Sequence, residues 1–251
     1  MDGPPNPEDD ATRPGQVVLL QELLDLAPRA DILDSQLVIL TVLAGLVALG
    51  GLFLNSPAII IGAMVINPLL EPIYAGTVFL ANGSLRKFFQ HMKVLGILIC
   101  FVIIVTVIVT ACLNVITTLP ITTEILSRLE YQEISAILAI LLGIIAIVAR
   151  KRGFVTAIIG VGISVALIPP VVVTGITIVL LPERIFDALS LMLNNIFGLL
   201  AGMLIAILVL GVGPRDKAKL ELSRKNVYLM AFFAACLLLI VFLMLRILRQ
   251  F

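Results

Sequence analysis

About seven apolar stretches, most of them long enough to cross a lipid bilayer, divide this chain of 251 residues. A transmembrane helix needs about 20 apolar residues, because the hydrocarbon core is roughly 30 Å thick and a helix rises 1.5 Å per residue. We therefore expect an all-α, polytopic transmembrane helical bundle. The stretches are residues 36–54, 57–82, 94–116, 134–149, 154–181, 188–213 and 227–245.

The composition excludes a soluble domain. Hydrophobic residues make up 61% of the chain and charged residues 13%, about half of the roughly 25% that is typical of soluble domains. The net charge of +1 gives no electrostatic basis for binding nucleic acid. The expected partners are the lipid bilayer and a small ion or solute, and we expect no nucleic acid.

The lysines and arginines predict an orientation, since cytoplasmic loops carry an excess of them. Basic residues lie between the second and third stretches, between the fourth and fifth, and between the sixth and seventh; residues 117–133 and 182–187 carry few. This alternation predicts seven crossings with a cytoplasmic N-terminus and a C-terminus outside. A re-entrant second stretch, with the N-terminus outside, also fits the charges.

The two halves of the chain resemble each other. An ungapped shift of 98 residues places the first three stretches on the next three and matches Gly45 with Gly143, Gly62 with Gly160, and Pro72 with Pro170. An odd number of crossings inverts the second copy, as in many secondary transporters; chance similarity of apolar helices is the alternative. We expect a 3+3 inverted repeat, and the expected segments are a tail over 1–34 with a short amphipathic helix, repeats over 35–116 and 133–213, and an additional transmembrane helix over 226–251.

Prolines interrupt the second and fifth stretches. Proline lacks an N–H group and clashes with the carbonyl four residues earlier, so Pro68 and Pro72 predict half-helices over 57–66 and 73–82. Pro169 and Pro170 predict a second break between 155–166 and 171–181. Freed carbonyls cannot face lipid, so each break must be buried in protein or line a wet cavity. Packing kinks are the alternative reading.

Glu71 lies beside the first break, where an ionised carboxylate costs at least about 2.5–3.5 kcal/mol and usually faces an interior cavity. We expect a proton or cation site there, with Glu71 and Asn67 as ligands if a metal cation binds; a neutral glutamic acid bonded to the broken backbone is the alternative. Amides and hydroxyls near the breaks could bind substrate or only join helices. The candidate ion- or substrate-binding residues are Asn67, Pro68, Glu71, Pro72, Ser164, Ile168, Pro169, Pro170, Asn194 and Asn195.

The motifs around both breaks resemble those of a multipass prokaryotic family described as an uncharacterised hydrophobic domain, a domain of unknown function. The likeness covers roughly residues 35–215 and implies a protein of the inner or plasma membrane. A glycine is usual in that family where this chain has Glu71, so a family-wide site would depend on backbone carbonyls. The motifs are Asn55-Ser56-Pro57, Ile61-Gly62-Ala63-Met64, Pro68-Leu69-Leu70 with Pro72-Ile73, and Ala166-Leu167-Ile168-Pro169-Pro170.

The favoured function is a transporter or channel whose pathway passes the two breaks, proton- or cation-coupled if Glu71 titrates. The second hypothesis is a non-transporting membrane scaffold or sensor. We expect no enzyme and no cofactor, since nucleophile, P-loop and metalloprotease motifs are missing from the sequence. Gly198 and Gly202, four residues apart, and the last stretch suggest a homo-oligomer.

Overall fold

The computed structural model describes residues 14–25, 33–130, 132–151, 156–214 and 217–248, and every regular element in those ranges is a helix. The expected all-α class is therefore confirmed. The helices are α2 (Pro14–Asp25), α3 (Ser35–Phe53), α4 (Pro57–Ile66), α5 (Leu70–Ala81), α6 (Leu85–Ile116), α7 (Thr123–Glu130), α8 (Gln132–Lys151), α9 (Thr156–Leu180), the 3-10 turn η1 (Pro182–Arg184), α10 (Ile185–Leu210) and α11 (Lys217–Leu248).

The helices have the length and apolarity of membrane spans. In the described ranges four segments qualify alone, and up to six spans result if two bent pairs each count as one. Many large apolar side chains, such as Ile104, Val115 and Phe232, are exposed on the outside of the bundle. Such a surface requires lipid, so this is an integral membrane protein. The four segments are Ser35–Phe53, Leu85–Ile116, Pro182–Leu210 and Lys219–Val241.

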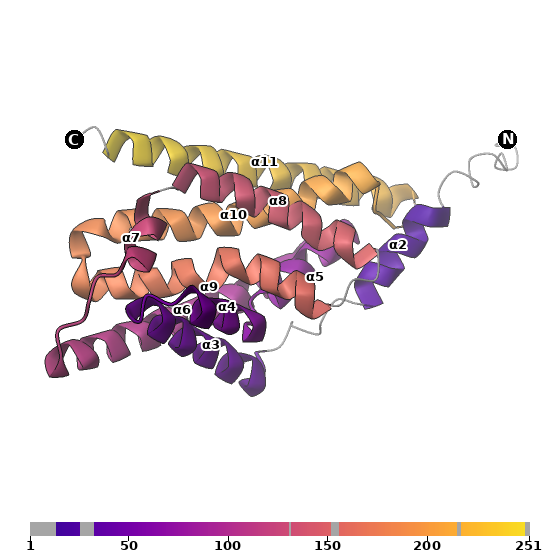
Figure 1. Cartoon of the computed structure of the whole chain (residues 1–251). Coiled ribbons are helices and arrows are strands. Elements are labelled where there is room, and N and C mark those ends of the chain that lie inside the picture. Colours follow the sequence, from indigo (N-terminus) through magenta and orange to yellow (C-terminus); the bar gives the residue numbers. More distant parts are fainter. Residues whose placement is uncertain (1–13, 26–32, 131, 152–155, 215–216, 249–251) are drawn as a thin grey trace, which may run out of the picture.

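The long helices run side by side, with the short helices α2 and α7 at opposite ends of the bundle (Figure 1). Helix α10 lies inside and packs against α8, α9 and α11. In the most apolar part of Pro182–Leu210, which contains α10, 67% is buried inside the bundle. In the corresponding part of α11, which lies at the edge, 17% is buried. Helix α6 begins at Leu85, so the basic residues Arg86, Lys87 and Lys93 belong to the same helix as the third apolar stretch.

Glycines allow α8 and α10 to approach closely. A Cβ atom added to Gly202 would lie 2.0 Å from the carbonyl oxygen of Ile140, and one added to Gly143 would lie 2.3 Å from that of Leu199. Gly198 likewise faces Ala139 of α8. The Gly198/Gly202 pair, which suggested an oligomer contact, is therefore used within the chain.

The second stretch is broken as predicted, but the fifth is not. Helices α4 and α5 bend by 47° at residues 67–69. In contrast, α9 runs without interruption through Pro169 and Pro170. The predicted break in the fifth span is therefore wrong: helix-breaking residues are tolerated in a membrane helix when neighbours satisfy the freed groups, and α9 is enclosed by α4, α6, α8 and α10.

The N-terminal helix docks on the bundle. A short helix was expected over residues 16–27, and α2 covers Pro14–Asp25; residues 26 and 27 lie outside the described ranges. Leu20 and Leu23 are buried, and the hydroxyl of the fully buried Tyr74 on α5 donates a hydrogen bond to the carbonyl of Leu23 at 3.2 Å. The helix is thus attached to the first half of α5.

Candidate functional site: a broken membrane helix

The break between α4 and α5 has a defined turn. Asn67 ends α4 in an extended conformation, with φ −73° and ψ 120°, and its Oδ1 atom accepts the Leu69 N–H at 3.2 Å. The Glu71 N–H donates to the carbonyl of Pro68 at 3.0 Å. An asparagine that bonds its own backbone two residues later offers an alternative to helix. The side chain of Asn67, which is buried, therefore holds the break open.

The same turn removes donors from the end of α4. The last four carbonyls of a helix have no intrahelical partner. Pro68 has no N–H, and that of Leu69 is taken by Asn67. The negative end of the α4 dipole therefore lies at the break, opposite the positive N-terminus of α5.

Glu71 and Pro72 lie in the first turn of α5 and do not extend the break. Pro72 is buried there, where a proline is tolerated because the N–H groups of a first turn have no partner in the helix. Glu71 and Pro68 are half-buried. An acidic residue in this position is stabilised by the helix dipole, so the structure gives Glu71 a favourable electrostatic environment.

Helix α9 brings the second group of predicted residues to the interior. Ile168, Pro169 and Pro170 are all buried, and the Thr174 hydroxyl bonds to the Pro170 carbonyl at 2.8 Å. Two consecutive prolines deprive the carbonyls of Val165 and Ala166 of their usual helical donors. Ser164 belongs to α9, but its side chain lies outside the described part of the structure.

Asn194 and Asn195 are buried in α10, at 3% and 4% exposure. The Oδ1 atom of Asn195 has no hydrogen-bond partner among the described residues. An unsatisfied buried amide oxygen costs about 1–3 kcal/mol. Buried polar groups are nearly always paired, so this oxygen is an acceptor that a bound ligand could use.

The three groups lie at matching distances along their helices. Asn67 is ten residues from the start of α4, Pro170 ten from the end of α9, and Asn195 ten from the start of α10. Ten residues of helix span about 15 Å, half of the roughly 30 Å hydrocarbon core. Helix α9 packs against both α4 and α10, so it lies between the helices that carry Asn67 and Asn195.

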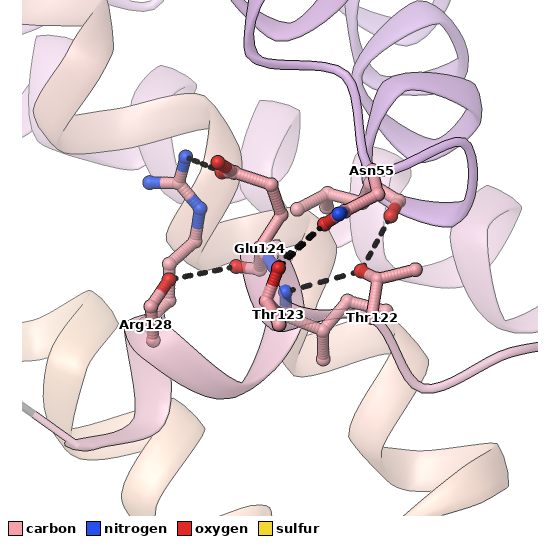
Figure 2. A network of polar contacts seen from close by, with 8 residues as sticks. Asn55, Thr122, Thr123, Glu124 and Arg128 are labelled. Carbon is pink, nitrogen blue, oxygen red and sulfur yellow. Dashed lines mark hydrogen bonds and ion pairs between the residues drawn. The ribbon is translucent and has the colours of Figure 1, made fainter.

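A polar network joins the turn between α3 and α4 to the start of α7 (Figure 2). The sequence analysis did not predict this network. Asn55 has a left-handed φ of 52°, and its Oδ1 atom accepts the Thr123 hydroxyl at 2.9 Å and the Glu124 N–H at 3.1 Å. The Thr122 hydroxyl donates to the Leu52 carbonyl at 2.7 Å. Glu124 also pairs with Arg128 at 3.0 Å. The Asn55-Ser56-Pro57 motif was the only sequence signal for this contact.

Two of the cavities in the described part of the chain lie away from the break. One of about 440 Å³ lies between α6, α10 and α11, and one of about 160 Å³ lies between the end of α10 and α11. Neither is lined by Asn67, Glu71 or Pro170. Among the described residues, no group of three or more His, Cys, Asp or Glu side chains could hold a metal ion. A cation at the break would therefore rely on carbonyl and amide oxygens together with Glu71.

Comparison with known proteins identifies relatives without an assigned activity. The family model described as a domain of unknown function (DUF389) matches residues 64–201, more than half of the chain. An uncharacterized protein of Methanocaldococcus jannaschii is 26% identical over 226 residues, which is 90% of this chain and 70% of that protein. No solved structure matches the chain significantly.

Proposed function

The chain belongs to this family of unknown function (DUF389), and we propose that it is a membrane transporter or channel for a small ion or solute. The site comprises the break at residues 67–69, the doubly proline-containing turn of α9 and the asparagine pair of α10. The observation that supports it is that the buried Oδ1 atom of Asn195 has no hydrogen-bond partner among the described residues. The proposal involves no catalytic step.

The chemistry of the site favours a cation. The negative end of α4 and the carbonyls of Val165 and Ala166 supply oxygen atoms, and half-buried Glu71 adds a carboxylate. Discontinuous membrane helices with such ends hold coupling ions in other transporters. Glu71 then couples transport to protons or to the bound cation.

In the proposed topology the chain crosses the cell membrane seven times, with the N-terminus in the cytoplasm and the C-terminus outside. The 47° bend supports a broken crossing, since a re-entrant loop must reverse its direction at the break. The inverted repeat then relates α3–α6 to α8–α10, although the second copy keeps its middle helix continuous. The exposed face of α11 is the proposed contact of a homo-oligomer.

Liposomes containing the purified protein test the proposal. We expect uptake or conductance of at least one monovalent or divalent cation, and Glu71→Gln should abolish its dependence on pH or on the coupling cation. Glu221→Gln is the matched control, since Glu221 is exposed on α11 away from the break.

Two results would contradict the proposal at different levels. If Glu71→Gln transports with an unchanged ion dependence, Glu71 is not the coupling group. The backbone oxygens would then be the remaining candidate ligands for the ion. If the wild-type protein moves no ion or small solute, a scaffold or sensor is favoured.

A further inference from the structure

A groove on the lipid-facing side of the bundle is almost wholly apolar. It has a volume of about 440 Å³ and lies between α6, α10 and α11. Phe88, Leu95 and Ile99 of α6 line one wall, Leu200 of α10 the floor, and Phe233 and Leu237 of α11 the other wall. We call it the α6–α11 groove. Its chemistry suits a hydrocarbon chain and not an ion or a polar solute.

The α6–α11 groove is as long as one leaflet is deep. Its lining on α6 runs from Phe88 to Ile99, a rise of about 16 Å along the helix. Half of the hydrocarbon core is roughly 15 Å. The groove begins close to the start of α6 at Leu85. We call this the basic end of the bundle, because Arg86, Lys87 and Lys93 lie there. It therefore matches the acyl region of a single leaflet.

Basic side chains continue one edge of the groove toward the membrane surface. Phe89 and Gly96 line it, and Arg86 and Lys93 occupy the same helical stripe at spacings of three and four residues. Both basic side chains are exposed, and helical side chains point toward the helix N-terminus, here the interface. The two ion pairs found among the described residues, Glu124–Arg128 and Asp187–Arg184, lie at the opposite end.

We propose that the α6–α11 groove binds an anionic phospholipid of the leaflet at the basic end, with an acyl chain between α6 and α11 and the phosphate near Arg86 and Lys93. Basic pockets between membrane helices recognise anionic headgroups in this way. The inference does not depend on the transport function.

Gly96 provides the test of the acyl site. A Cβ atom added there meets nothing within 4 Å, although the residue lines the groove, so Gly96→Leu should fill the groove without disturbing the fold. Native mass spectrometry of the full chain in detergent measures retention of phosphatidylglycerol and of phosphatidylcholine with the same acyl chains. We expect roughly tenfold weaker phosphatidylglycerol binding, equivalent to about 1.4 kcal/mol.

Matched variants separate the groove from the remaining surface. Gly62 is exposed and also has open space, but lies on α4, so Gly62→Leu should leave lipid binding unchanged. Lys93→Gln should remove the preference for phosphatidylglycerol over phosphatidylcholine. Lys225→Gln, at the same end but on another face of α11, should retain that preference.

Three results overturn the proposal. Equal retention of the two lipids by the wild-type protein would show that the groove does not recognise an anionic headgroup. Unchanged binding in both Gly96→Leu and Lys93→Gln shows that lipid binds elsewhere. A dimer that Gly96→Leu converts to a monomer, with lipid retention unchanged, identifies a second copy as the occupant. Lys93→Gln keeps the test valid if Gly96→Leu fails to fold.

Discussion

The Oδ1 atom of Asn55 accepts the hydroxyl proton of Thr123 at 2.9 Å, although the two residues are 68 positions apart. The same oxygen accepts the N–H of Glu124 at the start of α7. It therefore caps α7 from the turn between α3 and α4 (Figure 2). One side chain fixes the short crosswise helix to the first half of the bundle.

Asn55→Ala should lower the free energy of unfolding by about 1–2 kcal/mol, the usual effect of losing a helix cap. Asn55→Gly keeps the left-handed φ accessible but removes the acceptor, whereas Asn55→Asp keeps an acceptor. Unfolding in detergent should rank wild type and Asn55→Asp above Asn55→Gly, with Asn55→Ala lowest. Equal stability of Asn55→Gly and wild type would show that the capping bonds contribute nothing.

Gly202→Ala should destabilise the protein by about 1–3 kcal/mol, since the new methyl group would overlap the Ile140 carbonyl and force α8 from α10. Gly62→Ala, which meets open space, should be neutral or slightly stabilising because alanine favours helix. Thermal unfolding in detergent measures both. The oligomeric state should not change in Gly202→Ala; dissociation of an oligomer would instead place Gly202 at an interface between copies.

Pro170→Ala restores an N–H donor opposite the Ala166 carbonyl inside α9. Proline costs about 3 kcal/mol relative to alanine in a helix interior, so the variant should be at least as stable as wild type. If that carbonyl serves the proposed ion, cation flux in liposomes should fall roughly tenfold, or about 1.4 kcal/mol. A stable variant with undiminished flux would remove α9 from the site.

Tyr74→Phe should release α2, because it removes the hydroxyl that bonds to the Leu23 carbonyl. A hydrogen bond of this kind contributes about 0.5–1.5 kcal/mol. Hydrogen exchange over residues 20–25 should accelerate, while exchange in α10 should not change. Tyr228→Phe is the control, since Tyr228 is exposed on α11; similar acceleration in both variants would contradict a specific attachment.

Single cysteines should report two opposite membrane faces. The three native cysteines are first replaced by alanine. Ser127→Cys and Glu183→Cys should react from the same side, because Arg184 bonds to the Leu129 carbonyl at 3.3 Å. Lys225→Cys should react only from the other side. Labelling of all three from one side by a membrane-impermeant reagent would exclude the proposed topology.

Periodicity and proline chemistry predicted much of the architecture. The apolar run 36–54 became Ser35–Phe53, and Asn67-Pro68 ended α4 at Ile66, as local chemistry requires. Pro72 misled the prediction of where α5 starts, since it lies within the first turn. The prediction that Pro169 and Pro170 break the fifth stretch was wrong, since α9 is continuous there. Packing by neighbouring helices determines whether a proline breaks a membrane helix.

Long-range contacts set the limit of what the sequence could predict about the site. The candidate residues on α4, α9 and α10 were identified individually, but their matching positions along the helices follow from helix ends that only the structure defines. The capping role of Asn55 was not predictable, since its partners lie 68 and 69 residues away and share no periodic pattern with it. Proximity of this kind arises from tertiary packing.

The separation between Asn55 and its partners also sets an order for assembly during synthesis. Helices α3 to α6 can enter the bilayer as the ribosome releases them, but the turn at Asn55 gains its hydrogen bonds only after residues 122–124 have been translated. Closing so wide a loop carries an entropic cost that local helix formation does not. The turn between α3 and α4 therefore gains these hydrogen bonds only after all of α6 has been synthesised.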